Sequence, residues 1–234
     1  MIQSKVDANE SLEDLYHTTY IVNTREAANV INEMLCDHLP LDPTCIEPIV
    51  SIAKDVLDFE ILNHEHLIPQ FKQQTNLPHS LRLQEGVRVM FLNNKLFDEE
   101  ICNGTIGIVT RVVDDSVVEV TFPTFTCINR VMVRKETTYF DIDSKRASRQ
   151  QFPLQNAFAL TAHKVQGLTL PHVTTSVDET VFAEGQVYVA MSRATSWDNL
   201  RILSFNQEYL KCPRAALDEY ERLYMVYRNG LNNI

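Results

Sequence analysis

The pattern of apolar and polar positions changes twice along the chain. Residues 16–23 (YHTTYIVN) are β-branched and aromatic and predict a strand. Apolar residues then recur at helical spacing through about residue 39, and Asn23 or Thr24 can cap that helix. Residues 40–80 contain five prolines and predict a loop with short helical pieces, such as 60–74.

From residue 81 onward the period shortens to two. The segments GVRVMFL (86–92), TIGIVTRVV (105–113) and VVEVTF (117–122) predict strands, and two further strands are expected at 126–134 and 137–142. Turn residues separate them, including Asn103-Gly104 and Asp114-Asp115-Ser116. Several short strands in succession predict a small barrel or sandwich over residues 81–150.

After Pro153 strands and helices alternate again. Strands are predicted at 158–161, 173–177 and 200–205, a helix at 185–195, and a closing helix at 213–228 with apolar residues along one face. Strand–helix units at both ends of the chain therefore enclose a β-rich block, which predicts an α/β sheet domain interrupted by a small β insert. Ligands of open α/β sheets bind at the carboxyl ends of strands, here residues 23–25 and 160–167.

Charge is distributed unevenly over the 234 residues. The net charge is −10, and residues 1–66 alone hold thirteen acids and three bases, so the remaining residues sum to zero. Between residues 129 and 164, seven bases outnumber three acids. That basic stretch is either a surface that faces phosphates or a solvated basic face. The overall acidity argues against a protein that coats nucleic acid.

Composition also limits the compartment and the kinds of metal site. The five cysteines form no CxxC pair, so neither a disulfide framework nor a zinc site is expected. No apolar run is long enough to span a bilayer, and the first residues do not resemble a signal peptide. We therefore expect no membrane partner and an intracellular location, nuclear or mitochondrial in a eukaryote and cytoplasmic in a bacterium or virus.

The sequence lacks the motifs that hold nucleotide phosphates and their metal. No glycine is followed by lysine, which excludes a GxxxxGK[ST] phosphate loop. No Asp-Glu pair follows an apolar strand as a magnesium-binding carboxylate pair would. No metal site is therefore predicted in this chain.

Two polar clusters could nevertheless bind a phosphate. In FALTAHKVQGLTL (158–170), Thr161, His163, Lys164 and Gln166 come before Gly167 at the end of a strand. Their side chains are good donors to a phosphodiester backbone, and the alternative, which the residue chemistry alone favours, is a polar loop with a helix cap. Arg25 is a weaker candidate. The helix dipole disfavours a cation in the first turn of a helix, so its presence there suggests a partner, although chance is the better single explanation.

The second cluster is GQVYVAMSRAT (185–195). If the segment is helical throughout, Gln186 and Arg193 are seven residues apart and share a face away from the apolar positions. An arginine fork binds phosphate bidentately, although a surface arginine is the alternative.

Together these segments resemble a known family. TREAANVIN (24–32), residues 77–109, QFPLQNAFALTAHKVQGLTL (151–170) and residues 181–203 occur in the order and spacing of the C-terminal half of a Pif1-like superfamily 1B DNA helicase, including the helicases of Helitron transposons. The resemblance runs from about residue 16 to residue 205. It implies the second of two RecA-like motor domains, formed by residues 1–80 and 151–234, with an SH3-like β insert at 81–150.

The resemblance also implies roles for individual residues. Arg25 and the arginine finger Arg193 would reach the ATP γ-phosphate as catalytic residues. Gln186 would lie beside the nucleotide, and Gln166 and Gly167 would belong to the region that couples nucleotide to DNA. The residues implied to contact a single DNA strand are Thr161, His163 and Lys164.

The implied activity is 5′-to-3′ DNA unwinding driven by ATP hydrolysis. ATP and Mg²⁺ would bind only together with the ATP-binding N-terminal motor domain, in cis or in trans, so this chain alone is expected to show no ATPase activity and weak binding to single-stranded DNA. Two departures from the family pattern are Val165, where Ser or Ala is usual, and Asn93, where an arginine is usual. The alternative is a non-catalytic module that binds single-stranded nucleic acid or another protein.

Overall fold

The computed structural model describes residues 12–40, 48–58, 60–61 and 68–231. Contacts divide the described residues into two compact units, which are described separately: the first lies within residues 29–159, and the second within residues 12–28 and 160–231. The boundaries fall inside α3 (Arg25–His38) and β13 (Ala159–Thr161). The assignment of residues 1–80, 81–150 and 151–234 to domains stays a prediction.

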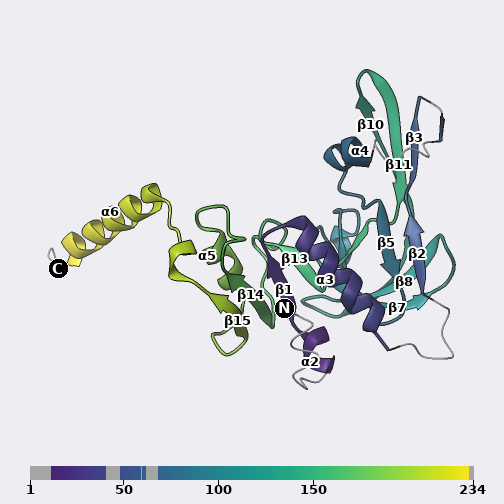
Figure 1. Cartoon of the computed structure of the whole chain (residues 1–234). Coiled ribbons are helices and arrows are strands. Elements are labelled where there is room, and N and C mark those ends of the chain that lie inside the picture. The colour runs from purple at the N-terminus through teal and green to yellow at the C-terminus, as the bar shows by residue number, and fades with distance from the viewer. Residues whose placement is uncertain (1–11, 41–47, 59, 62–67, 232–234) are drawn as a thin grey trace. The chain divides into compact units, whose positions relative to one another are not determined.

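The second unit is built on an open sheet with the strand order β13-β1-β14-β15 (Figure 1). β1 is parallel to β14, with Thr19 opposite Val173, and β14 is parallel to β15, with Val173 opposite Leu200. The elements are α2 (Leu12–His17), β1 (Thr19–Val22), β14 (Val173–Val177), α5 (Gln186–Met191), β15 (Leu200–Phe205), the 3₁₀ turn η3 (Gln207–Tyr209) and α6 (Arg214–Leu231).

The central strands of this sheet are buried almost continuously, as expected for parallel strands. The first three residues of β1 are buried, as are four of the five residues of β14. The buried hydroxyl of Thr175 donates to the carbonyl of Ile21 at 2.9 Å, so the polar atom is satisfied. Val187 of α5 packs with Val177 and Val181, which fixes this short helix against the sheet.

α6 exposes every side chain that the structure describes in it. The predicted apolar stripe of Leu217, Tyr220, Tyr224 and Tyr227 is present, but no described residue covers it. Among the described helices, none combines the length and the apolar character needed to cross a membrane.

The first unit is mainly antiparallel. One sheet has the order β12-β6-β7-β8-β9, a second has β10-β11-β3-β4, and β2 pairs with β5. The strands are β2 (Ile49–Ile52), β3 (Lys54–Leu57), β4 (Glu60–Ile61), β5 (Ser80–Leu83), β6 (Arg88–Phe91), β7 (Ile106–Val112), β8 (Val117–Pro123), β9 (Ile128–Arg134), β10 (Glu136–Ile142), β11 (Lys145–Gln151) and β12 (Leu154–Asn156), with helix α4 (Ile68–Gln74) and the 3₁₀ turn η2 (Phe97–Glu99).

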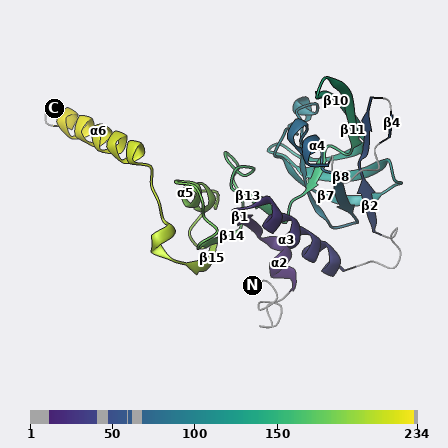
Figure 2. The ribbon, with the colours of Figure 1, turned by 45° about the horizontal axis from the view of Figure 1, so that its top comes forward.

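Buried phenylalanines contribute to the core of this unit. α4 lies beside β10 and β11 in both views (Figures 1 and 2), and its Phe71 packs on Ile142 and Ala147. In the five-stranded sheet, Phe122 occupies the space next to Gly107. A Cβ at Gly107 would lie 2.6 Å from the Phe122 ring and 2.8 Å from the carbonyl of Thr121, so this strand position requires glycine.

A buried ion pair joins two strands of the first unit. Arg149 of β11 is fully buried, and its Nε and Nη2 donate to the two carboxylate oxygens of Asp55 at 2.7 and 2.6 Å. Its Nη1 donates to the carbonyl of Leu77 at 3.1 Å, and the guanidinium lies over the Phe71 ring. Arg149 therefore does not face phosphates, and the basic stretch at 129–164 is not one surface.

Most of the predicted elements are confirmed. β14, α3, α6, β15 and the strands β6 to β10 lie where the pattern placed them. The expected strand at 16–23 is too long, because residues 16–17 end α2, and the helix predicted to reach residue 195 ends at Met191. β11 and β12 were not predicted, nor were the four strands found between residues 49 and 83. Part of the predicted helical piece at 60–74, residues 62–67, lies outside the described residues, as does Cys45.

Candidate functional site

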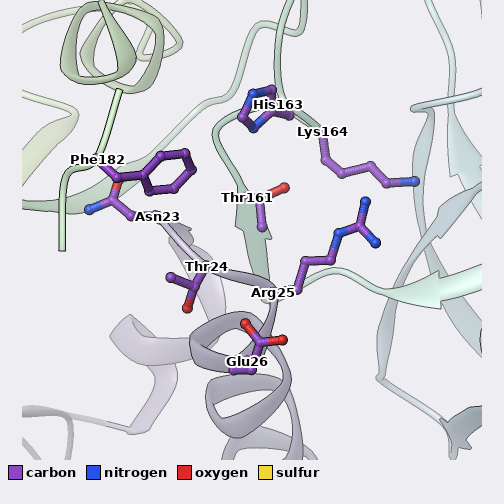
Figure 3. Close-up of a pocket in the computed structure, with 8 residues that line it drawn as sticks. All are labelled: Asn23, Thr24, Arg25, Glu26, Thr161, His163, Lys164 and Phe182. Atoms are coloured by element: carbon purple, nitrogen blue, oxygen red, sulfur yellow. The ribbon is translucent and has the colours of Figure 1, made fainter. Parts of the chain in front are cut away.

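A pocket of about 600 Å³ opens at the carboxyl edge of the parallel sheet in the second unit. Its walls come from the segments that follow β1 and β13 and from the loop after β14. This is the edge at which the sequence predicts a ligand. Figure 3 shows the lining residues, which are Asn23, Thr24, Arg25, Glu26, Thr161, His163, Lys164 and Phe182.

The N-terminus of α3 forms one side of this pocket. The hydroxyl of Thr24 accepts a hydrogen bond from the amide of Ala27 at 3.1 Å, which confirms Thr24 as the helix cap. The first turn of a helix has unpaired amide groups and the positive end of the helix dipole, and both attract anions. The carboxylate of Glu26 lies in the same turn and interacts favourably with that dipole.

Two cationic side chains, Arg25 and Lys164, line the same pocket. Burial, and to a lesser degree the positive charge of Arg25, lowers the pKa of Lys164 below its ordinary value. Within the described part of the chain, neither cation forms an ion pair with a carboxylate. An anion bound between them would stabilise both charged forms.

The turn that carries Lys164 is held in place by its backbone. The amides of Lys164 and Val165 donate to the carbonyl of Thr161 at 2.9 and 3.3 Å, and the Val165 side chain is fully buried. Valine at this position therefore serves as an anchor for the turn. The structure thus brings together Arg25, for which the resemblance implies a contact to ATP, and Thr161, His163 and Lys164, for which it implies contacts to a DNA strand.

Arg193 lies outside this group of residues. Because α5 ends at Met191, Arg193 follows the helix, and the predicted helical face shared with Gln186 is wrong. Its Nε donates to the carbonyl of Val189 at 3.0 Å and its Nη1 to the carbonyl of Leu168 at 2.9 Å. The guanidinium therefore ties α5 to the chain that follows Gly167. Its catalytic role stays a prediction.

Gln186 is buried and does not line the pocket itself. Its Oε1 accepts hydrogen bonds from the amides of Phe182 and Ala183 at 3.3 and 3.2 Å. Its Nε2 has no hydrogen-bond partner among the described residues. Gln186 thus supports the loop that carries Phe182, a lining residue that is not among the predicted site residues. The one available signal was an aromatic residue in a loop just before Gly185.

Gln166 and Gly167 occupy an exposed turn beyond Lys164. Gly167 has a φ of +85°, and no atom of the described residues would lie within 4 Å of a Cβ at this position, so backbone conformation and not crowding favours glycine. Their coupling role stays a prediction. In the described ranges, no group of three His, Cys, Asp or Glu side chains could hold a metal ion, so no Mg²⁺ ligands are assigned.

Comparisons with known proteins point to one family. Residues 68–112 match the family model described as DNA helicase Pif1, 2B domain. The chain is 32% identical over 197 residues to the ATP-dependent DNA helicase PIF1 of Rattus norvegicus, covering 83% of this chain and 31% of that protein. The chain therefore spans about a third of the length of that relative.

Solved structures give the same result. The crystal structure of Pif1 helicase from Candida albicans matches with a TM-score of 0.72 and 27% identity, covering 89% of this chain and 50% of that one. The structure of Bacteroides Pif1 in complex with ADP-AlF3 and single-stranded DNA matches with a TM-score of 0.63 and 27% identity, covering 89% and 45%. The α/β fold of this chain is thus that of helicase structures.

Proposed function

Since the chain belongs to the Pif1-like DNA helicases and corresponds to their C-terminal portion, we propose that it supplies the second motor domain of a 5′-to-3′ DNA helicase. The parallel sheet of the second unit, with a pocket at its carboxyl edge, supports a RecA-like motor domain. The consecutive antiparallel strands β6 to β9 support an SH3-like insert within residues 81–150.

The observation that carries this proposal is the pair of cations in the pocket. Arg25 and Lys164 converge there, beside the N-terminus of α3 and the hydroxyl of Thr161. These groups bind phosphate oxygens through charge and hydrogen bonds, without reading a base. Their ligand is a phosphate of a DNA strand or of ATP.

In this proposal the chain hydrolyses ATP only with an ATP-binding domain, in cis or in trans. An arginine finger stabilises charge on a phosphoryl group that other residues must hold, and it contributes about 10³–10⁵ in rate in that setting. To act in this way, Arg193 would exchange its hydrogen bonds to the carbonyls of Val189 and Leu168 for a phosphate. ATP and Mg²⁺ would then bind mainly through the other domain.

The test is binding of fluorescent oligo-dT by the 234-residue chain across a salt series. Affinity should fall as salt rises, because each phosphate contact releases counterions. Lys164→Ala should reduce the slope of the logarithm of affinity against the logarithm of salt concentration by about one, the amount expected for the loss of one phosphate contact. Lys211→Ala, which removes an exposed lysine outside the pocket, should change neither affinity nor slope. Equal slopes for wild type and Lys164→Ala would exclude the pocket as the phosphate site.

ATPase activity of the same chain tests the dependence on a second domain. We expect no turnover, with or without oligo-dT. Turnover that persists in Arg193→Ala would contradict the proposal, and turnover abolished by that substitution would place a complete nucleotide site in this chain.

The second candidate is a non-catalytic module that binds single-stranded nucleic acid. It is favoured by the same cationic pocket in a sequence without a phosphate loop. The two candidates differ when a separately produced ATP-binding domain of a Pif1 relative is added. DNA-stimulated ATPase that depends on Arg193 supports the motor, whereas unchanged activity supports the module.

A further inference from the structure

One wall of the cationic pocket is an exposed aromatic ring. Phe182 lines the pocket together with Arg25 and Lys164 and is 67% exposed. In Figure 3 its ring points toward the centre of the pocket from the side opposite Arg25 and Lys164. All three residues belong to the second unit. A ring in this position offers a free face to a ligand that also reaches the cations.

The loop that carries Phe182 is fixed at two points. On one side, buried Gln186 accepts hydrogen bonds from the backbone amides of Phe182 and Ala183. On the other side, Asp178 accepts from both the amide and the hydroxyl of Thr180, at 3.1 and 2.6 Å. The ring is therefore presented by an ordered backbone, which reduces the entropy lost when a ligand binds.

Two further contacts tie this loop to the sheet. The second carboxylate oxygen of Asp178 accepts from the hydroxyl of Ser204 in β15 at 2.7 Å. The side-chain amide of Asn23, at the end of β1, donates to the hydroxyl of Thr180 at 2.7 Å. Asn23 and Phe182 both line the pocket, so this hydrogen bond attaches the loop that carries Phe182 to the segment that carries Arg25.

The chemistry of these walls matches one class of ligand. Aromatic rings stack on nucleobases of any sequence, while arginine and lysine bind phosphate. A nucleotide carries both groups, and a pocket of about 600 Å³ lies in the size range of small-molecule sites. We propose that the pocket binds one nucleotide, with its base on Phe182 and its phosphate on Arg25 and Lys164, and that Gln186 is the residue that positions Phe182.

This inference rests on the proposed function, because the cations supply the phosphate half of the site. It adds a base-binding residue and gives Gln186 an indirect role through the loop. The nucleotide has two possible sources, a DNA strand or free ATP, and the experiment separates them.

The main measurement compares oligo-dT with an abasic oligonucleotide of the same length, which has the same phosphates and no bases. The wild-type chain should bind oligo-dT more tightly. Phe182→Ala should lower oligo-dT affinity roughly tenfold, within the range for a base stacked on an aromatic ring, and leave abasic affinity unchanged. Phe182→Trp should keep the difference. Tyr188→Ala, which removes a ring of similar exposure (73%) in α5, should also keep it.

Gln186 is tested through the same ratio of affinities. Gln186→Leu removes the acceptor of both amides and should reduce the preference for oligo-dT as Phe182→Ala does, without changing abasic affinity. Gln186→Glu retains an oxygen in the same place and should restore the preference. A purely structural role would instead lower both affinities together, along with the melting temperature.

The source is identified by repeating the comparison with a non-hydrolysable ATP analogue and inorganic triphosphate. If Phe182→Ala weakens binding of the ATP analogue but not of triphosphate, the ligand of the pocket is a free nucleotide. If Phe182→Ala weakens binding of oligo-dT alone, the ligand is a DNA strand. If Phe182→Ala changes neither comparison while Lys164→Ala still weakens binding, this inference is wrong and the proposed function stands. Absence of binding by the wild-type chain to every probe would contradict both.

Discussion

Cationic side chains occupy two contrasting environments in this chain, and each unit provides an example of one of them. In the first unit, Arg149 is fully buried and its fork is matched by the carboxylate of Asp55. In the second unit, Arg25 and Lys164 line an open pocket, and the described residues give them no carboxylate partner. Partners, and not residue type, therefore separate a structural cation from one that is available to a ligand.

Arg193 is intermediate between these extremes. It is half-buried, and its guanidinium donates to two backbone carbonyls and to the hydroxyl of Ser192. Carbonyls satisfy its hydrogen-bonding groups but do not neutralise its charge. We therefore expect the loss of stability on substitution to be largest at Arg149, intermediate at Arg193 and smallest at the pocket cations. The loss of ligand binding should follow the opposite order.

The largest stability effect is expected at Arg149. Arg149→Ala leaves Asp55 buried without its partner and should lower the free energy of unfolding by about 3–5 kcal/mol. The measurement is urea denaturation followed by circular dichroism. Arg130→Ala, at an exposed position of β9, should change it by less than about 0.5 kcal/mol.

A double substitution separates charge from packing at this site. Replacing Arg149 with Met and Asp55 with Leu together should recover much of the lost stability, since apolar residues of similar volume remove both charges. Equal destabilisation by Arg149→Ala and Arg130→Ala would show that the pair contributes nothing.

An intermediate effect is expected at Arg193. Arg193→Ala removes hydrogen bonds to the carbonyls of Val189 and Leu168 and should cost about 1–2 kcal/mol. Arg193→Lys should recover only part of this, because an ammonium lacks the planar fork that spans both acceptors. Thermal unfolding followed by the fluorescence of Trp197, the single tryptophan, reports on this unit. No loss of stability in Arg193→Ala would mean that the hydrogen bonds seen here do not hold the segment.

The smallest stability effect is expected in the pocket. Arg25→Ala and Lys164→Ala should each change the free energy of unfolding by less than about 0.5 kcal/mol, because neither removes a buried partner. A loss as large as that of Arg193→Ala would show that these cations have structural partners after all.

Lys164 should instead be revealed by the pH dependence of binding. Its pKa is lowered in the folded chain by burial first and by Arg25 second. Phosphate binds the charged form of the lysine, so oligo-dT affinity should be highest at pH values below the pKa of Lys164. It should fall as the pH rises through that pKa. The fall should therefore start at a pH below the ordinary lysine pKa of about 10.4. Lys164→Arg stays charged and should abolish this fall in anisotropy titrations. Identical pH profiles for the two proteins would exclude Lys164 from the binding site.

The sequence pattern predicted a helix or strand correctly where a single residue preference or periodicity extended over the whole element. The segment VTTSV at 173–177, rich in β-branched residues, corresponds to β14, and the helical spacing after Thr24 corresponds to α3. The pattern failed at β11, where the buried positions alternate correctly but are Ala147, Arg149 and Gln151. Two of these are polar, so hydrophobicity could not mark the strand.

Those polar residues become intelligible only with their partners. Gln151 bonds to the side chain and the backbone of Ser51, 100 residues earlier, at 2.8 and 2.9 Å. β2 also departs from the hydrophobic pattern, because the polar Ser51 is buried while its apolar neighbours Val50 and Ile52 are exposed. No window of sequence around either strand contains the group that makes its burial favourable.

The sequence by itself determined the strand–helix alternation at both ends of the chain. It also indicated the sheet edge at which a ligand is predicted and the candidate residues Arg25, Thr161, His163 and Lys164. Only the tertiary structure decided that these four share a pocket with Phe182, that Arg149 is buried, and that Arg193 follows its helix instead of lying on it. Periodicity and residue chemistry are local properties, whereas burial and pairing depend on which distant segments meet.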